Sequence, residues 1–321
     1  MIRIGVAGGA GYTAGELLRL LLRHPEAELA FVHSHSQAGK AIWEVHGDLL
    51  GETDLRFSEA VQPDIDLLFV CAGHGKTGPF LAAHDFPAEL VIIDLSNEFR
   101  LKDSGNAYVY GLPELNREAI RGAQFIANPG CFATCIQLAL LPLAAAGKLG
   151  NEVHVHAITG STGAGQKPLP TTHFSWRNHN LSIYKAFSHQ HLAEIQQSLQ
   201  QLQPGFDHDI NFLPLRGDFP RGIFASTYLH TEVEEAEAIE WYQQFYESHP
   251  FTHCSAANPH LKQVTNTNKA LVHVEKHRSK LLIVSIIDNL LKGASGQAVQ
   301  NMNLCFGLPE TTGLQLKASY F

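Results

Sequence analysis

The chain has 321 residues, a formal net charge of −8 and 45% hydrophobic residues. This composition is too apolar for a disordered protein, and the acidic excess argues against a protein that binds nucleic acid or a membrane surface. No apolar run approaches the roughly 20 residues of a membrane span. Five cysteines are too few and too scattered for a disulfide framework, and residues 1–6 do not resemble a signal peptide. We therefore expect a cytoplasmic protein of two domains.

The first part of the chain alternates short apolar runs with helical patterns. The Asp66–Cys71 run is almost entirely apolar, as in parallel strands that are buried on both faces. A broad leucine face ending at His24-Pro25 predicts a helix over 15–23. Strands that alternate with helices predict an α/β fold with a doubly wound, Rossmann-type parallel sheet. The predicted strands are residues 2–7, 28–33, 66–71, 90–95 and 124–127.

The second part has longer strands and fewer helices, which predicts an α+β domain with a mostly antiparallel sheet. Residues 151–159 alternate apolar and polar side chains, the period of a strand with unlike faces. The predicted strands are 151–159, 209–215, 222–231, 270–276 and 280–288, with a short hairpin connection at 277–279, and the predicted helices are 191–202, 234–248 and 295–305. We expect the last helix to return to the first domain, so the predicted domains are 1–148 plus 293–321, and 149–292.

A glycine-rich turn follows the first predicted strand and precedes the first predicted helix. Glycines at such a junction permit a tight turn and close approach to a pyrophosphate, and the helix N-terminus supplies amide donors. The spacing differs from G-x-G-x-x-G, and a purely structural turn is the alternative. The predicted cofactor-binding residues are Gly8, Gly9, Ala10, Gly11, Tyr12 and Thr13.

The end of the second strand indicates which dinucleotide is bound. NAD sites often carry an acidic residue about 20 positions after the glycines, where it binds the ribose hydroxyls. Here residues 33–40 contain Ser34, Ser36 and Lys40 and no carboxylate. Hydroxyls and a lysine suit the additional phosphate of NADP, so we expect NADP(H).

Cys131 is the candidate nucleophile. Pro129 and Gly130 predict a sharp turn after the fifth strand, and residues 134–141 have a helical pattern, which places Cys131 at or near a helix N-terminus. The helix dipole lowers the pKa of a thiol there, and the thiolate attacks an acyl carbon to form a thioester. The alternative is a buried, inert cysteine. We interpret Cys71, Cys135, Cys254 and Cys305 as structural.

These residues belong to a set of motifs that resembles one enzyme family over nearly the whole chain. The segment Ile126–Thr134, with Pro142, is similar to the active-site signature of N-acetyl-gamma-glutamyl-phosphate reductases. Further matching motifs lie, in order, at residues 8–17, 94–100, 110–114, 160–165, 189–195 and 292–298. The chain resembles the compact form of that family.

The resemblance implies NADPH-dependent reduction of an N-acyl-glutamyl phosphate, with N-acetyl as the expected acyl group, to the semialdehyde and phosphate in arginine biosynthesis. Related alternatives are the N-succinyl-glutamyl, aminoadipyl and aspartyl phosphates. A Pro-Gly-Cys turn does not favour aspartate-semialdehyde dehydrogenase, in which an Asn-Cys-Thr turn is expected. The alternative from another class is a non-catalytic NADP(H)-sensing protein, which would need neither Cys131 nor a partner histidine.

The resemblance also implies roles for individual residues. The family's general acid/base corresponds to His189, with His191 as the second choice, and imidazole has a suitable pKa for that role. Arg100 is expected to hold the departing phosphate. Of Arg216 and Arg221, which flank residues 217–220, Arg221 fits the family better as a carboxylate clamp. Ser161, and Gln297 or Asn301 near the last helix, are expected to contact the nicotinamide or the substrate, and Asn128 is expected near the substrate.

Nineteen histidines raise the possibility of a metal site. Three i, i+2 pairs occur, His33/His35, His154/His156 and His189/His191, but no HExxH or CxxC spacing accompanies them. We therefore predict no metal. The expected partners are the small-molecule substrate and, following the family's pairing through the second domain's sheet, further copies of the chain in a homodimer or homotetramer.

Overall fold

The computed structural model describes residues 1–73, 75–102 and 105–321, so that His74 lies outside the described residues. The chain forms two compact units: Met1–Pro129 with Ala294–Gln315, and Gly130–Gly293 with Leu316–Phe321. The first unit thus ends earlier than the predicted boundary at 148/149, because the helix that starts at Cys131 packs on elements of the second unit. None of the helices in these ranges is long and apolar enough to span a membrane.

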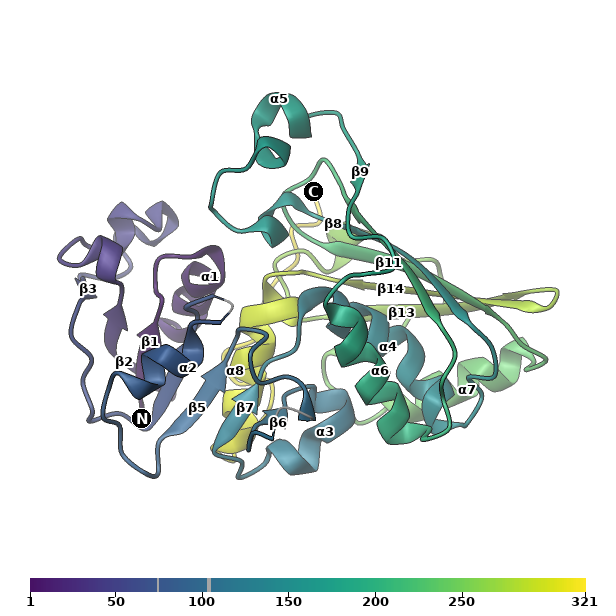
Figure 1. The fold of residues 1–321 in the computed structure, drawn as a ribbon, viewed down its shortest axis with the longest axis horizontal. Helices are drawn as coiled ribbons and strands as arrows, with labels where there is room; N and C mark the ends of the chain where they lie inside the picture. The colour runs from purple at the N-terminus through teal and green to yellow at the C-terminus, as the bar shows by residue number, and fades with distance from the viewer. Residues whose placement is uncertain (74, 103–104) are drawn as a thin grey trace. The chain divides into compact units, whose positions relative to one another are not determined.

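The first unit contains a seven-stranded, entirely parallel sheet in the order β3-β2-β1-β4-β5-β7-β6. The order runs outward in both directions from β1 and β4, which confirms the doubly wound prediction (Figure 1). All four residues of β4 are buried, as expected between two covered faces. The strands are β1 (Ile2–Ala7), β2 (Ala27–His33), β3 (Phe57–Ser58), β4 (Leu67–Val70), β5 (Val91–Asp94), β6 (Val109–Tyr110) and β7 (Phe125–Ala127).

Helices complete the first unit. The leucines of α1 (Tyr12–Leu21) are buried, as their helical spacing predicts, although the helix begins three residues before the predicted start. As expected, α8 (Gly296–Cys305) returns to this unit, where it contacts α1, α3 and β5 (yellow in Figure 1). The remaining helices are α2 (Thr77–Ala82), α3 (Pro113–Ile120) and the 3-10 turns η1 (His35–Gln37), η2 (Ile42–Glu44) and η3 (Gly47–Leu49).

The second unit contains a mixed seven-stranded sheet in the order β12-β13-β14-β11-β8-β10-β9. Four of its pairs are antiparallel, and only β8–β10 and β12–β13 are parallel, which confirms the mostly antiparallel prediction. Arg278, in the turn between β13 and β14, has φ 57°. The strands are β8 (Val153–Thr159), β9 (Ser182–Ile183), β10 (Ile210–Arg216), β11 (Ile223–His230), β12 (Thr252–Cys254), β13 (Ala270–His277) and β14 (Lys280–Ile287).

The helix α4 (Cys131–Ala145) is the central helix of the second unit. Its residues from Phe132 to Ala144 are all buried, as expected of a helix that is apolar on every side. Pro142 has no amide hydrogen to offer the carbonyl of Leu138, and the hydroxyl of Tyr246 donates to that carbonyl instead at 2.6 Å. With α6 (His191–Leu202) and α7 (Glu235–Tyr246), α4 covers one face of the sheet (Figure 1).

Shorter helices make up the rest of the second unit. They are α5 (Phe174–Arg177), the 3-10 turns η5 (Ser161–Ala164), η6 (Pro170–Thr172) and η7 (Leu261–Gln263), and the π-helix η8 (Leu291–Ser295), within which the chain passes back to the first unit.

Candidate active site

The glycine turn between β1 and α1 packs closely against neighbouring strands. Gly8 has φ +76°, and a Cβ on it would lie 2.6 Å from the carbonyl carbon of Cys71. A Cβ on Gly9 would lie 2.3 Å from Cγ1 of Val32. Gly11 is the N-cap of α1 without a side-chain cap, and a Cβ on it would meet no described atom within 4 Å. The turn therefore leaves space at a helix N-terminus, which fits the pyrophosphate of a dinucleotide.

The rest of the predicted loop surrounds this opening. Ala10 is half-buried and Tyr12 is exposed at the first position of α1. The carbonyl of Thr13 accepts a hydrogen bond of 2.7 Å from the hydroxyl of Ser295, which ties the start of α1 to the end of η8.

The predicted NADP-selecting residues follow β2. Ser36 and Lys40 are exposed, whereas Ser34 is buried. A carboxylate does lie in this region, supplied from outside the segment: Oε1 of Glu59 is 2.9 Å from Nδ1 of His35. Ser36 and Lys40 are thus the two of these predicted side chains that are exposed.

Arg100 lies buried beyond the end of β5. Its Nε donates to the carbonyl of Asn128 at 2.9 Å and its Nη2 to the carbonyl of Leu95 at 3.3 Å. Nearby, burial raises the pKa of the Asp94 carboxyl, although hydrogen bonds from Ser96 and the charge of Arg100 oppose this shift. The guanidinium is therefore fixed at the carboxyl edge of the first sheet, against the turn that leads to Cys131.

Both polar atoms of the Asn128 side-chain amide form hydrogen bonds within the first unit. Its Nδ2 donates to the carbonyl of Ala294 at 3.1 Å, and its Oδ1 accepts from Nδ2 of Asn301 at 3.1 Å. Asn301 also donates to the carbonyl of Gly111 at 2.8 Å. Asn128, predicted as a substrate contact, therefore fixes the turn before the cysteine. Gln297 lies one helical turn before Asn301 on α8 and is fully buried.

Cys131 is the first residue of α4, as predicted, with Gly130 as the N-cap and no side-chain cap. The thiol is therefore at the positive end of a helix of 15 residues. A Cβ on Gly293 would lie 2.9 Å from Cβ of Cys131, so the glycine of η8 makes the space that the cysteine occupies. Gly293 has no role that the sequence motifs predict.

His189 is brought near Cys131 within the second unit. Its ring packs edge-on against that of Phe132, the residue after the nucleophile, with centroids 5.5 Å apart. Burial, and to a lesser extent the charge of Lys185, lower the pKa of His189 to about 4. Its Nδ1 accepts the amide hydrogen of His191 at 3.2 Å, so the neutral ring carries its proton on Nε2.

Glu194 is a residue of this site whose role the sequence reasoning missed. It is buried on α6, and its Oε2 accepts from the amide of Gly130 at 3.0 Å. Its Oε1 lies 3.9 Å from Nε2 of His191. The segment from His189 to Glu194 thus contacts the nucleophile turn through both a ring and a carboxylate.

The two remaining predicted residues of the second unit are near β11. Arg221 forms a bidentate ion pair with Asp288, in which the Nε–Oδ2 distance is 3.0 Å and the Nη2–Oδ1 distance is 3.2 Å. The carboxylate of Asp288 is fully buried and also accepts the amide of Asn266. Ser161 begins η5, and its amide donates to the carbonyl of Phe219 at 2.8 Å.

The histidine pairs do not form a metal centre. Over the described ranges no group of three or more His, Cys, Asp or Glu side chains has a metal-binding arrangement. His154 stacks on Tyr228 with ring centroids 4.8 Å apart, and His35 pairs with Glu59. The five cysteines are free thiols, and burial raises the pKa of Cys71, Cys135 and Cys305 to about 12, which fits their structural interpretation.

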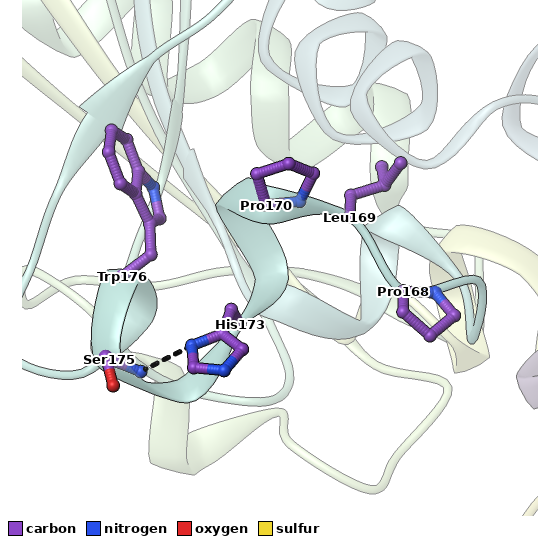
Figure 2. Close-up of a pocket in the computed structure, with 6 residues that line it drawn as sticks. All are labelled: Pro168, Leu169, Pro170, His173, Ser175 and Trp176. Carbon is purple, nitrogen blue, oxygen red and sulfur yellow. Dashed lines mark hydrogen bonds between the residues drawn. The ribbon is translucent and has the colours of Figure 1, made fainter.

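A cavity of about 670 Å³ lies along η6 and α5. Figure 2 shows its lining side chains, among them the exposed rings of Trp176 and Pro170 and the imidazole of His173, which accepts the amide of Ser175 at 3.3 Å. It contains none of the predicted site residues.

Known proteins resemble the chain over its whole length. The family model for the semialdehyde dehydrogenase NAD binding domain matches residues 3–123, and the model for the semialdehyde dehydrogenase dimerisation domain matches residues 131–289. The N-acetyl-gamma-glutamyl-phosphate reductases of Bacteroides thetaiotaomicron and Parabacteroides distasonis are each 59% identical over 322 residues, covering 100% of both chains.

Solved structures show the same fold at lower identity. The aspartate semialdehyde dehydrogenase II of Vibrio cholerae complexed with ASA is 20% identical, covers 95% of this chain and 98% of its own, and has a TM-score of 0.71. The enzyme from Candida albicans with NADP is 14% identical, with the same coverage and a TM-score of 0.72. The chain belongs to the N-acetyl-gamma-glutamyl-phosphate reductase family of semialdehyde dehydrogenases.

Proposed function

We propose that the protein reduces an N-acyl-L-glutamyl 5-phosphate, N-acetyl in the first instance, with NADPH to the 5-semialdehyde and phosphate, as a step of arginine biosynthesis. The observation that carries this proposal is Cys131 at the first position of α4, with His189 packed against the neighbouring ring of Phe132. The names of the full-length relatives support the substrate class.

Cys131 acts as the nucleophile. Its thiolate attacks the carbonyl carbon of the acyl phosphate, the carbon–oxygen bond to phosphate breaks, and a thioester forms. A hydride added to that carbon then breaks the carbon–sulfur bond, which gives the aldehyde and returns the thiolate of Cys131. Arg100, fixed by the carbonyls of Asn128 and Leu95, holds the departing phosphate.

NADP(H) fits the first unit because the glycine turn leaves an open space at the start of α1. When bound, it supplies the hydride. Residues 8–13 would hold its pyrophosphate, and the exposed Ser36 and Lys40 would hold its 2′-phosphate, whereas Ser34 is buried. Ser161 and Gln297 are the proposed residues for the nicotinamide.

His189 donates a hydrogen bond to the substrate oxygen. Its Nδ1 is occupied by the amide of His191, so its Nε2–H faces the substrate as the available donor. His191 is the candidate acceptor of the thiol proton. Oε1 of Glu194 lies 3.9 Å from its Nε2, and a nearby carboxylate stabilises a protonated imidazole. Separate His189→Asn and His191→Asn variants distinguish the two roles, since loss of the base slows thioester formation and loss of the donor slows reduction.

The test is the reverse reaction, oxidation of N-acetyl-L-glutamate 5-semialdehyde with NADP and phosphate, followed by NADPH absorbance. The wild-type protein should turn over, and Cys131→Ala should show no turnover while it still binds NADPH. Abundant product from Cys131→Ala contradicts the thioester route. Alkylation of Cys131 by iodoacetamide at the rate of an ordinary thiol would favour the NADP(H)-sensing alternative.

We also propose that the protein is a cytoplasmic homodimer or homotetramer that pairs through the second sheet. The five cysteines are free thiols, and thiols are kept reduced in the cytosol. The helices α4, α6 and α7 cover one face of that sheet, and on the other face Phe224, Tyr228 and Leu282 are only partly buried. The matching family model is a dimerisation domain. Light scattering should give a multiple of the 35.3 kDa chain mass, and Tyr228→Glu should lower it.

A further inference from the structure

Two arginines of the second unit, the buried Arg177 and the half-buried Arg216, have no acidic partner among the described residues. Arg177 donates from Nη1 to the carbonyl of Arg216 at 2.7 Å and from Nη2 to the hydroxyl of Ser182 at 3.1 Å. The Nε atoms of Arg177 and Arg216 are both buried, and neither has an acceptor among the residues that the structure describes. The nearby Asp218 is exposed, and its Oδ2 accepts the amide of His179.

Six other arginines of this protein lie close to carboxylates. Arg221, the predicted carboxylate clamp, is neutralised by the fully buried Asp288. A carboxylate oxygen also lies within 3.5 Å of Arg3, Arg19, Arg23, Arg117 and Arg121. A guanidinium with donors that are buried away from water and from any anion carries an uncompensated desolvation cost. The buried Arg177 and the buried Nε of the half-buried Arg216 therefore have the properties of a site that is completed by an anionic ligand.

Arg216 is connected to the nucleophile by a series of rings. Its Cζ lies 4.7 Å from the ring centroid of Tyr184, in a cation–π contact. The ring of Tyr184 is 5.9 Å from that of His189, which is 5.5 Å from that of Phe132, the neighbour of Cys131. Burial, and then the Cys131 thiol, raise the pKa of Tyr184 to about 12, so its phenol stays neutral and does not neutralise Arg216.

We propose that Arg216, held by Tyr184 and by Arg177, binds a carboxylate of the acyl-glutamyl substrate, in place of Arg221. This assignment rests on the proposed function. The phosphate is bonded to the carbon that Cys131 attacks, whereas the series of contacts from Arg216 to the neighbour of Cys131 runs through three rings, those of Tyr184, His189 and Phe132. The anion that lies several bonds from the reacting carbon is a carboxylate, either the α-carboxylate or one at the end of the acyl group.

Reverse-reaction kinetics with Arg216→Gln test the assignment. The substrates are the N-acetyl semialdehyde, the N-succinyl semialdehyde and an N-acetyl analogue whose α-carboxylate is a carboxamide. The matched control is Arg278→Gln, which changes an exposed arginine in the β13–β14 turn of the same unit. Loss of a charge-assisted hydrogen bond should lower kcat/KM roughly 10- to 100-fold, mainly through KM.

The pattern over the substrates identifies which carboxylate is bound. If it is the α-carboxylate, both acyl substrates lose the same factor and the carboxamide loses nothing further. If it is the carboxylate of the acyl group, only the N-succinyl substrate loses activity. Arg216→Gln kinetics within about threefold of Arg278→Gln on every substrate overturn the assignment.

Thermal unfolding separates binding from structure. Because the half-buried Arg216 has no acidic partner and its buried Nε has no acceptor among the described residues, Arg216→Gln should unfold at the wild-type temperature or above it. A lower unfolding temperature together with an equal loss on all three substrates, the carboxamide included, means a structural role and overturns the assignment. No turnover by the wild-type protein with any substrate overturns the proposed function itself, which is a different result from turnover that does not depend on Arg216.

Discussion

The carboxylate of Glu194 accepts the amide hydrogen of Gly130, the residue immediately before Cys131, at 3.0 Å. Both residues are buried, and they lie on different elements: Glu194 is in the first turn of α6, and Gly130 is the N-cap of α4. The start of the nucleophile helix is therefore fixed by a side chain 64 positions further along the chain. The helix α4 therefore begins without a side-chain cap from its own N-cap residue, Gly130.

Glu194→Ala should destabilise the protein by about 1–3 kcal/mol, because it leaves the buried amide of Gly130 without an acceptor. Glu194→Gln keeps an oxygen at the same position and should lose much less. Urea midpoints of the two variants against wild type measure the difference. Equal midpoints for the alanine and glutamine variants contradict the capping role.

Gly293→Ala should slow turnover roughly 100-fold, because the added methyl group would displace Cys131 and small misplacements of a reacting group are costly. Its Cβ would lie 2.9 Å from Cβ of Cys131. The matched control is Gly150→Ala, whose Cβ would meet no described atom within 4 Å. The steady-state turnover rate and the rate of iodoacetamide alkylation should both fall in Gly293→Ala and stay unchanged in Gly150→Ala. Wild-type values of both rates in Gly293→Ala would show that Cys131 does not need the space beside Gly293.

Stability should fall as the pH drops from about 6.5 to about 4, in part through His189. The folded-state pKa of His189 is lowered to about 4 from 6.5, so between these values the unfolded state binds more protons than the folded state. This difference amounts to on the order of 3 kcal/mol once the pH is below both values. His189→Asn should flatten the stability–pH curve in that window, and a curve with an unchanged slope would contradict the buried neutral ring.

Lys40→Met should raise the KM for NADPH about tenfold and leave that for NADH unchanged, because only NADPH carries the 2′-phosphate. Lys40 is exposed beyond β2, where it is accessible to a ligand. Lys280→Met, at the exposed start of β14 in the other unit, is the control. An equal rise for both cofactors would place Lys40 away from the phosphate.

The sequence allowed the two sheets, the glycine turn and the position of Cys131 to be predicted, because each depends on local patterns. β4 is a continuous apolar run, and Pro129-Gly130 precedes an apolar helix. Among the strands of two or three residues, β3, β6, β9 and β12 show no period and were not predicted, whereas β7, also of three residues, was predicted.

Partners distant in sequence were not predictable in the same way. An apolar pattern on every side of α4 predicts that the helix is buried, but it does not show which sheet the helix packs against. The predicted domain boundary at 148/149 therefore lies after α4, whereas the structure has it before α4. Arg216 and Arg221 look alike in sequence, and only the fold shows that Arg221 has Asp288, 67 positions away, as its partner. Likewise, only the fold shows that the Asn128 side-chain amide forms hydrogen bonds with Ala294 and Asn301, which are distant in sequence.

The first unit is assembled from two segments, Met1–Pro129 and Ala294–Gln315, with the second unit's sheet and helices encoded between them. During synthesis, residues 130–293 emerge as one continuous stretch, while the first sheet still lacks α8 and the contacts of Asn301 and Ser295. Folding of domains generally follows the order of emergence. Here the first unit begins to be translated first but is completed last, because its helix α8 follows the whole of residues 130–293 in the chain.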